Sequence, residues 1–154
     1  MRDLEGGGRI FDLEDRLLEY AVRIVRLAES IPKTRAGNHV SGHLLRCGTS
    51  PLFNHGEAEA AESPSDFIHK LRVSLKELRE SLRALRLLAK VPLVDDPNRL
   101  GPLLQETDEL IRIFVASIKT AERNKAKRGT SSSSSRPADM TVDAAEEETT
   151  GLAS

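Results

Sequence analysis

Seven basic side chains recur along one stretch of the sequence at alternating spacings of three and four residues. On a helix, this spacing places all of them on one face. They are His69, Arg72, Lys76, Arg79, Arg83, Arg86 and Lys90. Such a row can bind the phosphate groups of a nucleic acid, or the carboxylates of another helix or subunit. We call these seven residues the basic face and treat them as the first candidate interaction site.

Three interpretations of the basic face are open at the level of the sequence. It could be a solvated helix face, with Glu77 and Glu80 as local counter-charges. It could form salt bridges between helices or subunits, which is the alternative that we expect. The acidic residues available on other helices are Glu14, Glu19, Glu106 and Glu109. It could also bind a phosphate backbone, although only Phe67 lies near it, so base stacking on single strands is not indicated.

Two other groups of residues have the right types for chemistry but lack the partners that chemistry needs. His39, His43 and Cys47 are spaced by four residues and could face one way on a helix. Three such groups can bind Zn²⁺, but no fourth ligand follows at a suitable spacing. We therefore predict no metal site and a packed Cys47 thiol.

The second group surrounds Pro51. Here Asn54, His55, Glu57 and Glu59 could perform acid–base chemistry. No nucleophile, phosphate-binding loop or paired acid accompanies them, so we predict a protein that is not an enzyme and has no cofactor. We expect Asn54 and Glu57 to satisfy backbone groups near the proline, or to pair with basic residues of the next helix.

The composition favours an all-α protein. The chain has 154 residues, of which 38% are hydrophobic and 3% aromatic, with no Trp. A β-sandwich or barrel would need more β-branched and aromatic residues. Cys47 is the single cysteine, which excludes an intrachain disulfide and favours a reducing compartment. No apolar run approaches the roughly 20 residues that span a bilayer, so we expect a cytoplasmic protein without a membrane partner.

Apolar periodicity predicts four helices, at about residues 13–30, 36–61, 64–90 and 101–125. Gly48 and Pro51 interrupt the second, so we expect a kink there or two shorter helices. The predicted fold is an up-and-down four-helix bundle over residues 9–125. Residues 1–8 are predicted to be a flexible N-terminus, and the Ser-rich, acid-ended segment 126–154 a disordered tail.

Several large apolar residues lie off the predicted seams of the helices. They are Leu18, Val25, Leu87 and Leu88. A four-helix chain cannot bury all of them without an unusually wide core. We therefore expect a homo-oligomer.

The order and spacing of several short motifs carry a family resemblance. The segment Leu44–Ser50 reads LLRCGTS, and Asn54 and Glu57 follow it. The segment Asp66–Leu71 reads DFIHKL, and Leu85–Leu88 reads LRLL. Together they resemble the bacterial four-helix bundle proteins encoded in intervening sequences of large-subunit ribosomal RNA genes. The resemblance covers most of residues 12–122.

The resemblance implies an up-and-down bundle that assembles into a ring-like homopentamer without established enzymatic activity. A relative of that family is the accessory variability determinant of diversity-generating retroelements, which binds nucleic acid through a basic surface. The two functions expected for this chain are therefore a homo-oligomeric assembly or interaction protein, or an accessory factor that binds nucleic acid or a ribonucleoprotein through the basic face.

Overall fold

Four long helices make up the protein in a computed structural model, which describes residues 8–133 and the side-chain environments of residues 13–132. The helices are α1 (Gly8–Ser30), α2 (Arg35–Glu59), α3 (Pro64–Leu88) and α4 (Gly101–Ser133). A short 3₁₀ helix, η1 (Pro97–Leu100), leads into α4. Residues 8–133 contain no strand. The predicted all-α four-helix bundle is confirmed.

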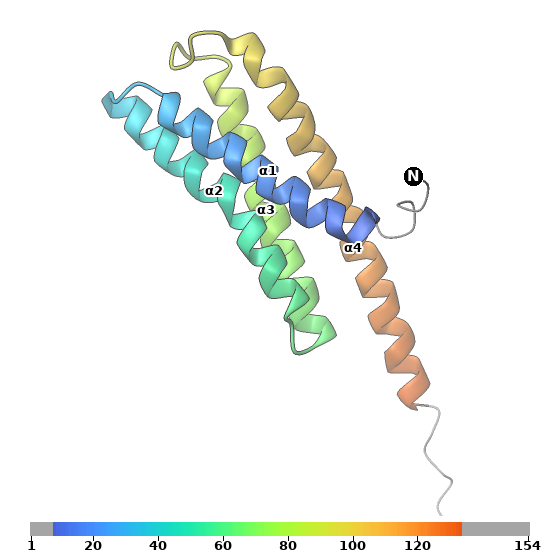
Figure 1. Cartoon of the computed structure of the whole chain (residues 1–154). Helices are drawn as coiled ribbons and strands as arrows, with labels where there is room; N and C mark the ends of the chain where they lie inside the picture. Colours follow the sequence, from blue (N-terminus) through green and yellow to red (C-terminus); the bar gives the residue numbers. More distant parts are fainter. Residues whose placement is uncertain (1–7, 134–154) are drawn as a thin grey trace, which may run out of the picture.

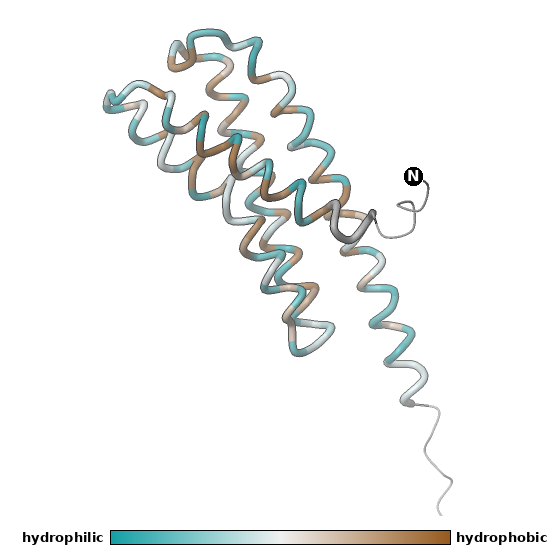
Figure 2. Tube along the Cα trace, in the orientation of Figure 1, coloured by the Kyte–Doolittle hydropathy of each residue, from teal (hydrophilic) through white to brown (hydrophobic). Residues whose placement is uncertain are grey.

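The helices run alternately up and down, and α3 lies between α2 and α4 (Figure 1). In sequence order, each helix packs against the next, whereas α1 and α4 touch only over a short stretch. Apolar residues recur along the helices where they face one another, and the last turns of α4 are mainly polar (Figure 2). Between residues 8 and 133, no helix combines the length and hydropathy that crossing a bilayer requires.

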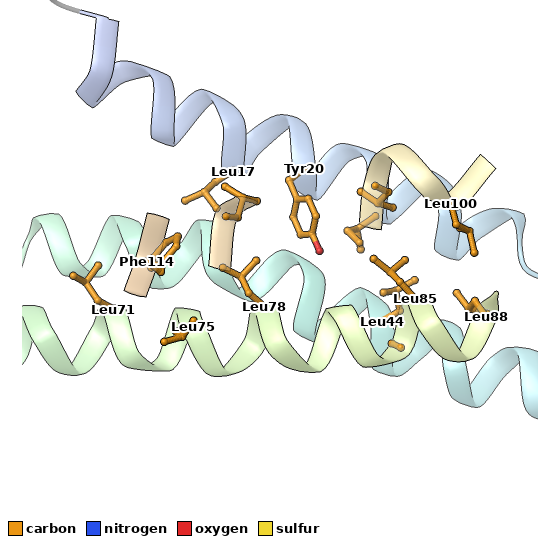
Figure 3. Close-up of a cluster of buried hydrophobic side chains, with 14 of the residues drawn as sticks. Leu17, Tyr20, Leu44, Leu71, Leu75, Leu78, Leu85, Leu88, Leu100 and Phe114 are labelled. Carbon is orange, nitrogen blue, oxygen red and sulfur yellow. The ribbon is translucent and has the colours of Figure 1, made fainter. Parts of the chain in front are cut away.

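Leucine side chains from all four helices fill the core (Figure 3). The spacing of three and four residues explains which side of α3 is buried, because Leu71, Leu78 and Leu85 share one helical face. Tyr20 and Phe114 are the largest fully buried side chains. Burying a leucine side chain contributes roughly 1.5–3 kcal/mol, so this shared seam holds the bundle together.

The start of α3 is stabilised by residue types that favour helix initiation. Ser63 is the N-cap and its side-chain oxygen accepts a hydrogen bond from the Asp66 amide at 3.1 Å. Pro64 occupies the first helical position, where its missing N–H costs nothing. Thr34 caps α2 in the same way, through the Gly37 amide at 3.0 Å.

The second helix is not broken. It runs without interruption through Gly48 and Pro51, which corrects the expectation of two shorter helices. Pro51 itself is buried. On either side of it, side chains add hydrogen bonds to helix carbonyls: Thr49 Oγ1 donates to the Leu45 carbonyl at 2.7 Å, and Asn54 Nδ2 donates to the Ser50 carbonyl at 3.0 Å. Packing on α1 and α3 outweighs the cost of the proline.

Both outer helices are longer than the sequence predicted. The first begins at Gly8 rather than near Leu13, so Gly8, the last residue of the predicted flexible N-terminus, is helical. The rest of that predicted segment, residues 1–7, lies outside the described residues. The last helix continues to Ser133, which corrects the predicted start of the tail at residue 126. Residues 134–154, the rest of that predicted tail, also lie outside the described residues. The extra turns of α4 are exposed through residue 132, so they extend the helix without adding to the core.

Gly48 sets the distance between α1 and α2. A Cβ atom at this position would lie 2.6 Å from Cγ2 and 2.8 Å from Cγ1 of Ile24. Ile24 is fully buried, so its side chain has no free space to move into. The absence of a side chain at Gly48 therefore allows the two helices to approach.

We expect Gly48→Ala to lower the free energy of unfolding by about 1–3 kcal/mol, because the added methyl group would push α1 away from α2. Gly42→Ala is the matched control on the same helix, because a Cβ there meets nothing within 4 Å. That control should raise stability by up to about 1 kcal/mol through helix propensity alone. Urea unfolding of both variants measures the difference, and equal effects would contradict the close approach.

Candidate functional site

The basic face lies along the solvent-exposed side of α3 and the turn that follows it. All seven of its side chains, from His69 to Lys90, are exposed. They are exposed because the leucine seam of α3 faces α2 and α4, and the basic residues are offset from it around the helix. The structure therefore brings the predicted residues together as one surface.

Four of these residues line a groove between α3 and α4. The groove has a volume of about 510 Å³, and its basic residues are Arg72, Lys76, Arg79 and Arg83. The buried side chains of Leu75 and Ile118 also line it. His69, Arg86 and Lys90 lie on the exposed surface beyond it. The groove thus concentrates positive charge beside a small apolar surface.

Two of the four expected acidic partners are engaged elsewhere, and Glu14 and Glu19 make no ion pair with a described residue. Glu106 and Glu109 bind Arg16 of α1 and not the basic face. Glu80, which also lines the groove, lies 3.9 Å from Arg46 and 3.7 Å from His43 of α2. Within the described residues, the one ion pair made by the basic face is between Arg72 and Glu122 of α4. Salt bridges to Glu106 and Glu109, as expected from the sequence, do not form within the chain.

Asn54 and Glu57 have the structural roles that the sequence suggested. Asn54 Nδ2 donates to the carbonyl and the hydroxyl of Ser50, one helical turn earlier, at 3.0 and 2.8 Å. Glu57 accepts a hydrogen bond from Lys70 of α3, and this contact raises the pKa of Lys70. Both side chains therefore stabilise α2 and its contact with α3.

The remaining chemical groups do not form a site. His55 is 8% exposed and packs edge-on against Phe114, with ring centroids 6.3 Å apart. Its Nδ1 has no hydrogen-bond partner among the described residues, and its Nε2 lies 3.9 Å from Glu59.

His39, His43 and Cys47 do not come together as a metal site in the described residues. Cys47 is fully buried, whereas His39 is exposed, and no group of three potential metal ligands occurs in the described part of the chain. The Cys47 thiol donates to the Leu44 carbonyl. Burial raises the pKa of this thiol, which favours the unreactive protonated form.

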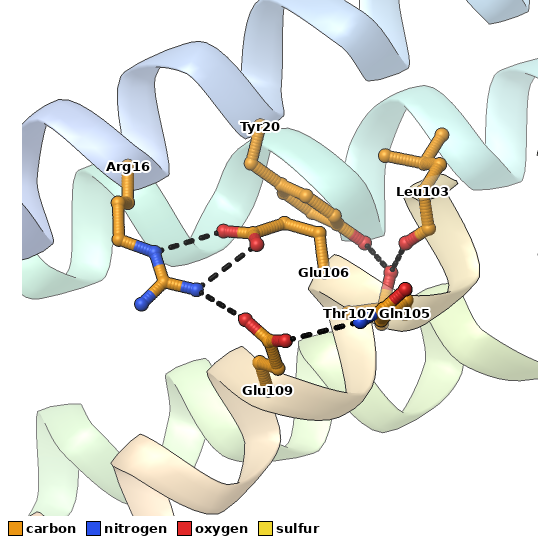
Figure 4. Close-up of polar contacts among 7 residues, drawn as sticks. All are labelled: Arg16, Tyr20, Leu103, Gln105, Glu106, Thr107 and Glu109. Atoms are coloured by element: carbon orange, nitrogen blue, oxygen red, sulfur yellow. Dashed lines mark hydrogen bonds and ion pairs between the residues drawn. The ribbon is translucent and has the colours of Figure 1, made fainter. Parts of the chain in front are cut away.

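Polar contacts close the bundle between α1 and α4 (Figure 4). Arg16 makes two hydrogen bonds to Glu106, at 3.0 and 2.9 Å, and a third to Glu109 at 2.9 Å. These carboxylates raise the pKa of Arg16. The contact between Arg16 and Glu106 was not predicted from the sequence, because nothing in the periodicity of the helices places these two residues opposite each other.

A second polar contact between α1 and α4 lies deeper in the bundle, where Tyr20 Oη is 2.8 Å from Thr107 Oγ1. Because the Thr107 hydroxyl donates to the Leu103 carbonyl, the Tyr20 hydroxyl is the donor to Thr107.

An exposed apolar patch covers the outer side of the α1–α2 contact. It consists of Leu18, Val22, Val25, Leu52 and Phe53, and all but Leu18 line a single groove of about 470 Å³. Leu18 belongs to the same side of α1, one turn before Val22. Phe53 is 66% exposed and Leu18 is 52% exposed. We call these five residues the α1–α2 patch.

The expectation that the chain would not bury all four apolar residues off the predicted seams is confirmed, because Leu18, Val25 and Leu87 are exposed. The fourth, Leu88, is fully buried in the core. Phe53 was not predicted to be exposed. Its position in the sequence, two residues after Pro51, gave no sign of which side of α2 would face solvent.

Comparison with solved structures identifies a close match in fold. A crystal structure of a protein of unknown function from the S23 ribosomal protein family of Bacteroides thetaiotaomicron superposes with a TM-score of 0.64. The two sequences are 34% identical, and the match covers 69% of this chain and 97% of that one. This chain belongs to the S23 ribosomal protein family. No family model matches the sequence, and no curated protein matches it either.

Membership of the S23 family agrees with the bundle seen here, because the match extends over nearly the whole of its relative. It also means that this chain has additional residues outside the region shared with that relative. The relative's function is unknown. The interaction surfaces of this S23 family member must therefore be interpreted from its own side chains.

Burial raises the pKa of Tyr20 to about 12, because the low-dielectric core disfavours the phenolate. The unfolded value is about 10, so the stability that Tyr20 contributes should be complete below about pH 10 and lost as pH rises toward 12. Tyr20 is the single tyrosine and there is no Trp, so phenolate absorbance should titrate near pH 12 in the folded protein.

The control is Tyr20→Phe, which removes the titrating group and one hydrogen bond. It should lower stability by about 1 kcal/mol at neutral pH. The difference between wild type and variant should shrink above about pH 10. A phenolate that titrates near pH 10 in folded protein would show that Tyr20 is solvated.

Proposed function

We propose that this S23 family member is a non-enzymatic assembly protein that forms a closed homo-oligomer through the α1–α2 patch. The observation that carries the proposal is the patch itself: five apolar side chains gather on one surface, and Phe53 is 66% exposed. A contiguous apolar surface that contains an exposed aromatic residue is typical of a protein–protein interface. Arg26 at its edge would supply a polar rim.

The family resemblance favours a ring of five subunits. A ring with cyclic symmetry of this kind needs two different surfaces on each subunit, because the front of one meets the back of the next. A second exposed apolar side chain, Leu87, is 48% exposed and lines a separate groove between α2 and α3 with Val40 and Ala84. The α1–α2 patch of one subunit could therefore meet the Leu87 groove of its neighbour.

We expect wild-type protein to have a native mass that is a multiple of the 16.9 kDa of one chain, measured by light scattering or native mass spectrometry. The double variant Val25→Ser and Phe53→Ser should weaken assembly at least about tenfold, because each lost apolar contact costs about 1.4 kcal/mol or more. Circular dichroism should show unchanged helix content, since both residues are exposed.

Two further variants sharpen this test. Leu87→Ser should also weaken assembly if the ring uses two surfaces, whereas a two-fold dimer built on the α1–α2 patch alone would be unaffected. Arg112→Ser removes a large exposed side chain from α4, together with its ion pair to Asp108, and should leave assembly unchanged. A wild-type protein that stays monomeric at micromolar concentration would refute the proposal.

A second candidate function is binding of a nucleic-acid backbone through the basic face. The groove between α3 and α4 supports it, because Lys76, Arg79 and Arg83 line it and make no ion pair with a described residue. The name of the family refers to ribosomal proteins, which are in contact with RNA, and this supports nucleic-acid binding. The formal net charge of −1 means that attraction would come from this surface and not from the whole chain.

To test this candidate, Arg79, Arg83 and Arg86 are replaced together by Gln, which removes charge and keeps helix propensity. If the face binds phosphates, affinity for an RNA or DNA duplex should fall, and the salt slope should decrease by up to about 3. Arg112→Gln on the outer side of α4 is the control. If the triple variant weakens assembly and not nucleic-acid binding, the basic face serves contacts between subunits.

A further inference from the structure

The groove between α3 and α4 presents cations whose counter-charges are not provided by the bundle. Lys76, Arg79 and Arg83 are exposed and make no ion pair within residues 13–132. The nearby carboxylate of Glu80 is turned toward His43 and Arg46. Exposed like charges spaced three and four residues apart on a helix repel one another by a few tenths of a kcal/mol per pair. An acidic ligand would relieve this repulsion.

The chain carries such a ligand in its own sequence. Residues 134–154 contain five Asp or Glu and one Arg. Four of these acidic residues, Asp143 and Glu146–Glu148, lie within six positions of one another, and Asp139 precedes them. Their negative charge complements the three unpaired cations of the groove. The acidic segment also includes Met140 and Val142, whose apolar side chains suit the small apolar surface at Leu75 and Ile118.

The length of the chain allows the segment to reach the groove. The helical rise of about 1.5 Å per residue places Ser133, the end of α4, about 22 Å from Ile118 in the groove. Glu146 follows Ser133 by thirteen residues, and an extended chain of that length spans up to about 43 Å. A segment attached this close has an effective concentration of the order of millimolar, so even weak ionic contacts can hold it in place.

We propose that the acidic segment Asp139–Glu148 folds back along α4 and occupies the groove of the same chain, where it covers Lys76, Arg79 and Arg83. The segment acts there as an internal polyanion. Any external acidic ligand, whether a nucleic acid or an acidic protein, must displace it. This inference concerns one chain and does not depend on the oligomeric state.

Zero-length cross-linking with a carbodiimide, which joins carboxylates to amines, tests the contact in the full-length protein. Because arginine does not react, Arg79→Lys and Arg83→Lys are introduced to supply amines while keeping the charge of the groove. We expect mass spectrometry to find cross-links from Glu146–Glu148 or Asp143 to residues 76, 79 and 83. They should decrease at least tenfold in 1 M salt, where the Debye length is about 3 Å.

The matched control is Arg112→Lys, which places an exposed amine on α4, beside its ion-pair partner Asp108. Cross-links from the acidic segment to residue 112 at the same frequency would show random encounter and overturn the proposal, as would their absence from the groove or their persistence in high salt. Chains of two isotopic compositions, refolded together, identify the source of the segment. Cross-linked pairs of mixed isotopic composition would overturn docking within one chain.

Discussion

The burial of one face of α3 is the constraint on which the rest of the structure depends. Leu71, Leu78 and Leu85 occupy the interior between α2 and α4, and no other helix packs against both of those neighbours to the same extent. Once this face is buried, the offset of the basic residues around the helix leaves them on the surface. The same helical spacing in α3 thus produces both the buried apolar face and the exposed basic face.

Closure of the bundle on its fourth side uses polar contacts in place of a long apolar seam. Arg16 binds Glu106 and Glu109, and Tyr20 donates to Thr107 in the core. These contacts fix the relative position of α1 and α4, which touch only over a short stretch. Both carboxylates therefore serve the contact between α1 and α4 and not the basic face.

Tight packing of α1 on α2 depends on Gly48, and the same pair of helices carries the exposed α1–α2 patch. Because Ile24 lies directly against Gly48, the helices approach closely on their inner side. On the outer side, Val25 and Phe53 remain exposed in the described part of the chain. A close inner contact and an exposed apolar groove therefore lie at the same helix pair, and this groove is the surface that we propose for contacts between subunits.

The sequence by itself determined the helical class, the number of helices, the cap at Ser63 and the shared face of the basic residues. Those features depend on local periodicity and on residue types at helix ends, which act over a few positions. It left two roles open for Glu57, a bond to backbone groups near Pro51 or a pair with the third helix, and the structure shows the second through Lys70.

Only the tertiary structure decided the continuity of α2 through Pro51, the burial of Leu88 and the exposure of Phe53. It also selected Arg16 as the partner of Glu106 and Glu109, residues about ninety positions away. Local spacing predicts which residues share one face of a helix. It does not identify the helix that covers that face or how much of the face stays exposed, because these depend on how separate helices pack.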